Sequence, residues 1–125
     1  MLIIAGGILE ENGMILLAQR KQDDEYGLKW EFPGGKLKEN ETGEDCIIRE
    51  LKEELGIDIE ITGFFDKYVE NDFIILYYLV KRVSGKITLN AHEKVQWVFL
   101  DELNNYDLLS VDHEVAHKLS QQAHA

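Results

Sequence analysis

Three glutamates lie within five residues near the middle of the chain, in the stretch RELKEELGI at residues 49–57. On an α-helix, Glu50 lies three residues before Glu53 and four before Glu54, so all three side chains project from one side. Like charges at these spacings destabilise a helix by roughly 0.2–0.5 kcal/mol per pair, and the helix dipole disfavours anions near its C-terminal end. The cluster indicates a site for a positive ion. The alternative is an ordinary solvated face, because most charged residues are exposed.

The residues upstream of this cluster add further oxygen atoms that can surround a cation. Gly34 and Gly35 permit a backbone path that is closed to other residues, so a main-chain carbonyl can approach a ligand closely. Carboxylates and a backbone carbonyl together form an all-oxygen set, which hard divalent cations bind, Mg²⁺ first and Mn²⁺ next. The sequence offers no cluster of His or Cys residues suited to zinc.

The clearest predicted element is a helix from Thr42 to Leu55, which carries the glutamates. Thr42 is typical of a helix N-cap, with Asp45 three residues later as in a weak capping box, and Gly56 is typical of a helix end. An apolar stripe at helical spacing is expected to face the core. It consists of Ile47, Ile48, Leu51 and Leu55.

Apolar runs separated by turn residues predict the strands that support this helix. The runs 2–9 and 14–19 flank Asn12-Gly13, which is a strong hairpin signal. Pro33 and two glycines are expected to end a short strand in the segment 30–35. Further strands are expected over 57–61, 72–83 (a central strand), 86–89 and 95–100, with a short helix capped by Asp101 and a last helix over 111–122. This irregular order favours an α/β or α+β fold in which a mixed sheet lies between helices.

The composition limits the class of protein. The 125 residues suggest one domain over 1–125, and 45% hydrophobic residues is a globular composition. The formal net charge of −11 disfavours a nucleic acid polymer as partner, although a metal cation can bridge a small anionic substrate to an acidic protein. Cys46 is the only cysteine, and the N-terminus shows neither a basic leader nor a membrane span. We therefore expect a cytoplasmic protein without membrane contact.

The segment from Gly35 to Ile57 resembles a known motif. Five residues separate Gly35 from Glu41, seven more precede Arg49, and RELKEELGI follows. This matches the Nudix box, G-x5-E-x7-R-E-U-x-E-E-x-G-U with U a bulky aliphatic residue, at every defined position. The preceding WEFPGGKL is similar to the MutT branch, small nucleoside triphosphate pyrophosphohydrolases. The resemblance implies a Nudix fold, in which the box forms a loop, a helix and a loop beside a mixed sheet.

The resemblance also implies roles for the box residues. Arg49 would hold the acidic cluster by ion pairing, and Glu41 would support the loop and helix or lie in the outer metal shell. Glu53 is the first candidate for the general base that activates water, the alternative being that it is only a metal ligand. The implied Mg²⁺ ligands are the carbonyl of Gly35 and the side chains of Glu50, Glu53 and Glu54.

One position departs from the resemblance. Many MutT-like proteins carry a loop glutamate six residues before the tryptophan of the late strand, where it binds metal or acts as base. Counting back from Trp97 gives Ala91, and Glu93 is close but out of register. The departure leaves the identity of the general base open without affecting the implied metal site.

Three residues outside the box are candidates for substrate binding. Arg20 matches a position that holds substrate phosphate in the MutT branch, or it is an ordinary surface arginine. Asp112 falls where MutT-like enzymes carry a base-reading Asn or Asp; a carboxylate accepts hydrogen bonds and suits an exocyclic amino group such as N4 of cytosine. Its alternative role is that of a helix N-cap. Tyr77 stacks on a base or packs in the core.

The predicted function is Mg²⁺-dependent hydrolysis of a nucleoside triphosphate to the monophosphate and pyrophosphate, with oxidised, modified or cytidine-type nucleotides among the substrates. A second interpretation keeps the box but changes the substrate to ADP-ribose or another nucleoside diphosphate derivative. A third is a nucleotide-binding module without catalysis, although such a module need not keep a self-repelling acidic cluster. A monomer and a homodimer are equally compatible with the sequence.

Overall fold

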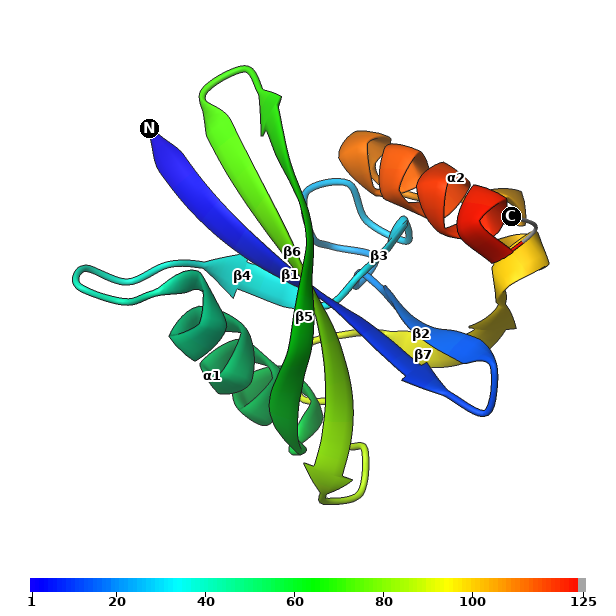
Figure 1. Cartoon of the computed structure of the whole chain (residues 1–125), viewed down its shortest axis with the longest axis horizontal. Coiled ribbons are helices and arrows are strands. Elements are labelled where there is room, and N and C mark those ends of the chain that lie inside the picture. Colours follow the sequence, from blue (N-terminus) through cyan, green and yellow to red (C-terminus); the bar gives the residue numbers. More distant parts are fainter. Residues whose placement is uncertain (124–125) are drawn as a thin grey trace.

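A computed structural model describes residues 1–123 of the 125-residue chain (Figure 1). Over these residues the strands form one mixed sheet, in which β1 runs parallel to β6 while the other pairs are antiparallel. The main path of the sheet has the order β3-β2-β1-β6-β5, with β4 paired to β1 and β7 paired to β2. The strands are β1 (Leu2–Glu11), β2 (Met14–Gln19), β3 (Trp30–Glu31), β4 (Gly34–Lys36), β5 (Asp58–Glu70), β6 (Phe73–Ser84) and β7 (Lys94–Phe99).

Two helices lie on opposite sides of the strands, α1 (Gly43–Leu55) and α2 (Ser110–Ala123) (Figure 1). Each helix covers its own buried cluster. Ile47 and Leu51 of α1 belong to one cluster, and Val111 and Val115 of α2 belong to the other. The predicted α+β class, with a mixed sheet between helices, is confirmed. Within residues 1–123, no helix is both long and apolar enough to cross a membrane.

The first hairpin and the first helix form as the sequence predicts. Asn12 and Gly13 both have positive φ angles, 54° and 79°, as a two-residue hairpin turn with the twist of the flanking strands requires. The hydroxyl of Thr42 accepts a hydrogen bond from the amide of Asp45 at 3.1 Å, and Gly56 ends α1 in the left-handed conformation at φ 71°. Caps at both ends therefore define where α1 begins and ends, and with it the place of the glutamates on the helix.

The apolar stripe of α1 differs from the prediction in one residue. Ile47, Leu51 and Leu55 are fully buried, but Ile48 is 39% exposed. Ile48 lies about 100° further around the helix than Ile47, beyond the edge of the buried face. Cys46 on the other edge of that face is fully buried instead.

Several strand predictions were incomplete or wrong. The segment 30–35 divides into β3, which pairs with β2, and β4, which pairs with β1. β5 continues to Glu70, nine residues beyond the predicted end, because register shifts near Gly63 and Phe64 break the alternation that signals a strand. The segment 86–89 is not a strand, since the amide of Thr88 donates to the carbonyl of Leu55 at the end of α1 instead.

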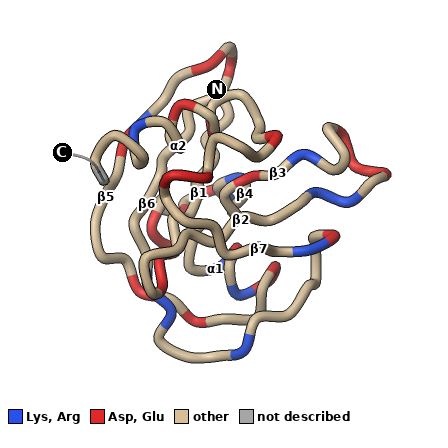
Figure 2. The backbone as a smooth tube through the Cα atoms, turned by 90° about the vertical axis from the view of Figure 1, so that its right-hand side faces the viewer, with Lys and Arg blue, Asp and Glu red and all other residues tan. Residues whose placement is uncertain are grey.

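The C-terminal elements are close to their predicted places. A 3₁₀ helix covers Leu100–Asn105, so Asp101 lies inside it and is not its cap. α2 begins at Ser110, one residue before the predicted start. Figure 2 shows acidic segments spread over the backbone with Lys and Arg segments between them, in accord with the formal net charge of −11.

Candidate active site

A cavity of about 960 Å³ connects the glutamate-bearing end of α1 with the start of α2. Its volume lies at the upper end of the usual range for small-molecule sites. Gly34, Gly35 and Glu54 line one end, and Asp112 and Tyr77 line the other. The structure thus brings residues from four distant parts of the sequence to one space. Arg20 and Ala91 also line this cavity.

Arg49 is the centre of an ion-pair cluster beside the cavity. Its Nε and Nη2 atoms donate to the two carboxylate oxygens of Glu41, at 2.7 and 2.9 Å. Its Nη1 atom donates to Glu50 at 2.9 Å and to Glu53 at 3.2 Å. The hydrogen bonds from Arg49 lower the pKa of Glu41 to about 2, and those to Glu41 raise the pKa of Arg49 above its usual range. Arg49 thus joins Glu41, Glu50 and Glu53 in one ion-paired cluster.

Glu54 lines the cavity and is not among the acids that Arg49 contacts. Burial, followed by the charges of Glu50 and Glu31, raises the pKa of Glu54 to about 9. Its Oε1 atom is buried and has no hydrogen-bond partner in the part of the chain that the structure describes. A buried carboxylate oxygen without a partner is unfavourable unless a cation or a proton satisfies it.

Gly35 lies directly against Glu50. A Cβ atom at position 35 would come within 2.4 Å of the Glu50 carboxyl carbon, so no other residue type fits there without displacing the carboxylate. The carbonyl of Gly35 accepts a hydrogen bond from the Cys46 thiol at 3.5 Å. A main-chain segment therefore lies close against the acidic helix at Gly35.

The three glutamates share one side of α1 but divide between two environments. Glu50 and Glu53 face Arg49, whereas Glu54 faces the cavity. Over residues 1–123, no three acidic, His or Cys side chains are gathered as the ligands of a bound ion would be. The Glu53 side chain is 55% exposed. The donors fit a hard divalent cation by chemistry, since all are oxygens and one of them is buried without a partner.

At the other end of the cavity, Asp112 is almost fully buried and accepts two hydrogen bonds. The Tyr77 hydroxyl donates to Oδ1, and the amide of Phe32 donates to Oδ2 at 3.1 Å. Burial, followed by the charge of Glu31, raises the pKa of Asp112 to about 7, while its two hydrogen bonds oppose the rise. Both oxygens bond outside α2 and Asp112 lies inside the first turn, so the helix N-cap alternative is wrong.

Tyr77 belongs to both the core and the cavity wall. Its side chain is 2% exposed, and its ring lies edge-on to those of Phe32 and Tyr68, with centroid distances of 6.1 and 5.7 Å. Burial, followed by the charge of Asp112, raises the pKa of the Tyr77 hydroxyl far above its usual range. Of the two alternatives for Tyr77, stacking on a base or packing in the core, the ring is therefore packed in the core. Its hydroxyl orients Asp112.

Arg20 lines the cavity, but it is not a free surface arginine. Its Nη1 atom donates to Glu31 at 2.9 Å, and its Nε atom donates to the carbonyl of Glu25 at 2.8 Å. Glu93, close to the expected loop glutamate, is exposed and is absent from the cavity wall.

The sequence-based prediction omits two contacting residues of the cavity wall, among others. They are Glu31 and His92, whose side chains meet at 2.8 Å between Oε2 and Nε2. Glu31 alternates with the aromatic residues of WEFPGG, which is the one signal that could have drawn attention to it. His92 is a single histidine in a polar loop, and no sequence pattern marks it.

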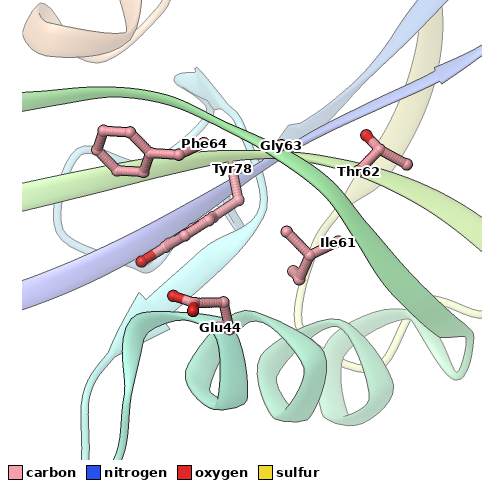
Figure 3. Close-up of a pocket in the computed structure, with 6 residues that line it drawn as sticks. All are labelled: Glu44, Ile61, Thr62, Gly63, Phe64 and Tyr78. Carbon is pink, nitrogen blue, oxygen red and sulfur yellow. The ribbon is translucent and has the colours of Figure 1, made fainter.

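A second pocket, of about 420 Å³, lies between the start of α1 and the bulged part of β5 (Figure 3). The Tyr78 ring lies beside that of Phe64, with centroids 5.5 Å apart. Burial, followed by a hydrogen bond with Glu44, raises the pKa of Tyr78 to about 12. The pocket contains none of the predicted site residues; its wall consists of Glu44, Ile61, Thr62, Gly63, Phe64 and Tyr78.

Comparisons with known proteins agree with this geometry. A family model described as NUDIX domain matches residues 3–119. The chain is 34% identical over 121 residues to a Buchnera aphidicola (subsp. Schizaphis graminum) protein named 8-oxo-dGTP diphosphatase, covering 95% of this chain and 92% of that protein. It is 35% identical over 117 residues to an Escherichia coli protein named CTP pyrophosphohydrolase, covering 90% and 86%.

A solved structure shows the same fold. The solution structure of the E. coli ORF135 protein superimposes with a TM-score of 0.82 at 28% identity, covering 98% of this chain and 89% of that one. Proteins of this family generally use divalent metal ions, as the oxygen-rich end of the cavity suggests. The match over most of the chain confirms the resemblance of the Gly35–Ile57 segment, and the chain belongs to the NUDIX family of hydrolases.

Proposed function

We propose that the protein hydrolyses a nucleoside triphosphate to the monophosphate and pyrophosphate and requires Mg²⁺, which Mn²⁺ can replace. The observation that carries the proposal is the single cavity with Glu54 and Gly35 at one end and buried Asp112 at the other. Carboxylates cannot attract a triphosphate by themselves, so that end requires cations between protein and substrate. The names of the two relatives, which specify nucleoside triphosphates, support the same substrate class.

The acidic end of the cavity would hold the metal. Bound there, Mg²⁺ would neutralise phosphate charge, orient the substrate and acidify a water molecule. Arg49, with Glu41 behind it, would keep the acids in position. Glu53, the most exposed of the three glutamates, would take the proton of the attacking water. The proposed ligands are the carbonyl of Gly35 and the carboxylates of Glu50, Glu53 and Glu54.

The buried end of the cavity would hold the base. Asp112 uses one lone pair on each oxygen for the Tyr77 hydroxyl and the Phe32 amide, which leaves capacity to accept from the substrate. An ionised carboxylate accepts from an exocyclic amino group and rejects a carbonyl oxygen, so cytosine N4 fits better than uracil O4. Arg20 would contact the phosphates with Nη2, the guanidinium nitrogen atom that Glu31 and Glu25 do not use. The partner is thus a small nucleotide, and the proposed compartment is the cytoplasm.

A panel of substrates tests the proposal. Pyrophosphate release would be measured from CTP, UTP, dCTP, ATP and 8-oxo-dGTP, and nucleoside monophosphate release from ADP-ribose, each with Mg²⁺ and with chelator. We expect turnover of nucleoside triphosphates that chelator abolishes, with CTP above UTP. Preference for ADP-ribose would select a hydrolase of another nucleoside diphosphate derivative, and absence of turnover on every compound would select a binding module.

A further inference from the structure

Glu31 lines the cavity and is held there by two side chains. Arg20 Nη1 donates to its Oε1 atom at 2.9 Å, and His92 Nε2 lies 2.8 Å from its Oε2 atom. The Glu31 side chain is 13% exposed, so neither contact is an ordinary surface ion pair. Glu31 lines the same cavity as Glu54 and Asp112, and its charge raises the pKa of each of them.

His92 is almost fully buried, with 4% of its side chain exposed. Nε2 is the ring atom that contacts Glu31, and Nδ1 is buried without a hydrogen-bond partner among the residues that the structure describes. A buried polar atom without a partner lowers the stability of the folded state. The buried Nδ1 atom therefore gives the histidine no advantage in stability over an apolar residue of similar shape, and only the contact of Nε2 with Glu31 distinguishes the two.

The loop that carries His92 is anchored on both sides. The Asn90 side chain and main chain donate to the carbonyls of Glu53 and Glu54, at 3.0 and 3.1 Å. On the other side, the amide of Glu93 donates to the carbonyl of Gln19 in β2 at 2.8 Å. His92 is thus fixed relative to both the acidic end of α1 and the strand that precedes Arg20.

Arg20, the second partner of Glu31, also contacts the loop after β2. Arg20 Nε donates to the carbonyl of Glu25, and Nη1 donates to Glu31, so two of the three guanidinium nitrogen atoms are committed to the protein. Nη2 makes no hydrogen bond within residues 1–123 and belongs to a residue of the cavity wall. The direction in which Nη2 points depends on where the Glu31 carboxylate lies.

We propose that His92 is a positioning residue for substrate binding: through Nε2 it holds Glu31, and Glu31 in turn orients the Arg20 guanidinium toward the substrate phosphates. The inference rests on the proposed function, because it requires a phosphate-bearing substrate in this cavity. The contact acts equally on bound substrate and transition state, since His92 does not touch the reacting atoms. Its loss should therefore raise KM more than it lowers kcat.

A double-mutant cycle tests the proposal. The variants are His92→Phe, which keeps the ring shape without a nitrogen atom, Glu31→Gln, and the double variant. Kinetics would be measured with the nucleotide that the wild type turns over fastest, together with the Tm of each variant. His92→Gln is the conservative variant, because its amide can reach the place of Nε2. His117→Phe, on the exposed face of α2, is the matched control.

We expect His92→Phe to raise KM about tenfold, with kcat within about twofold of the wild type, and to lower Tm only slightly, because Glu31 keeps its contact with Arg20. His92→Gln should restore KM to within about threefold, and His117→Phe should leave KM unchanged. In the Glu31→Gln background, His92→Phe should change KM by less than about twofold, because the residue through which His92 acts is already altered.

The same rise in KM in both backgrounds, or a loss confined to Tm, would overturn the inference. If His92→Phe does not fold, His92→Asn replaces it in the cycle, since its shorter amide reaches Nδ1 but not Nε2, and the same two outcomes decide. A wild type without turnover on any nucleoside triphosphate overturns the proposed function and this inference together. An active wild type whose KM is insensitive to His92→Phe overturns this inference alone.

Discussion

The hydroxyl of Tyr77 donates a hydrogen bond to the carboxylate of Asp112, joining β6 to the first turn of α2 inside the cavity. The two residues are 35 positions apart in the sequence, and each is an independent candidate for substrate binding there. Because of this hydrogen bond, Tyr77 and Asp112 act together on one group, the Asp112 carboxylate. Tyr77 keeps Asp112 in place and favours its ionised form, which is the form that accepts hydrogen bonds only.

The first prediction concerns base selection by Asp112. In Asp112→Asn the side chain gains an amino group, so it can donate to a carbonyl oxygen as well as accept from an amino group. We expect the ratio of kcat/KM for CTP to that for UTP to fall about tenfold, which is the size of one lost polar discrimination. Equal losses on both nucleotides would show that Asp112 supports only the core around Tyr77. Asp72→Asn, an exposed loss of the same charge, is the control.

The second prediction concerns the pH dependence of stability. Burial raises the pKa of Asp112 from 3.8 to about 7. Between these pH values the folded protein retains a proton that the unfolded chain has released, so stability falls as pH rises. The stabilisation from this proton is fully present below pH 3.8 and is lost as the pH rises through about 7. It amounts to a free energy of unfolding on the order of a few kcal/mol.

Urea unfolding of the wild type and of Asp112→Asn across this pH range measures that contribution. We expect the free energy of unfolding to decline less steeply with pH in Asp112→Asn, while Asp72→Asn keeps the wild-type slope. Parallel curves for all three proteins would show that Asp112 does not take up a proton in this range.

The third prediction concerns Glu54. Glu54→Gln keeps the shape of the side chain but removes a carboxyl group whose ionised form Glu50 and Glu31 repel. We expect turnover to fall by about a hundredfold or more, because a metal ligand is lost, while the Tm without metal stays the same or rises. Glu39→Gln, an exposed residue of the same type, should change neither quantity. A large drop in the metal-free Tm of Glu54→Gln would assign Glu54 to the structure and not to the metal.

The fourth prediction concerns Arg49. Its guanidinium joins Glu41, Glu50 and Glu53, so Arg49→Met leaves these carboxylates to repel one another. We expect a lower Tm without metal and a larger increase in Tm on addition of Mg²⁺ than in the wild type, because a bound cation replaces part of the lost charge. Arg49→Lys keeps the charge but not the bidentate fork, and its Tm should lie between the two. A metal-free Tm equal to that of the wild type would mean that the ion pairs contribute nothing.

Local signals predicted the parts of the fold that local chemistry decides. The Asn12-Gly13 turn and the Thr42 and Gly56 caps each need a particular residue type at one position, and the structure has all three. Bulges could not be predicted, because they depend on pairing with a distant strand, and β5 was therefore predicted too short. The segment 86–89 has strand-like residues but bonds to the end of α1, a contact that no local pattern reveals.

The same division holds for the candidate site. The shared side of the acidic residues of α1 follows from their spacing on one helix, whereas the place of Gly35 beside Glu50 is seen only in the structure. The contacts among Arg20, Glu31 and His92 come from three separate segments, and their distance in space is set by the sheet. Sequence spacing therefore predicts the metal end of the cavity better than its opposite wall.

A crystal structure with Mg²⁺ and a non-hydrolysable nucleoside triphosphate analogue tests the central claim most directly. We predict that Glu53 leaves Arg49 and that an ion binds to the Gly35 carbonyl, Glu50, Glu53 and Glu54, with the triphosphate on the ion and the base beside Asp112. A nucleotide bound elsewhere, or glutamates that keep their contacts with Arg49 while no ion lies near them, would contradict it.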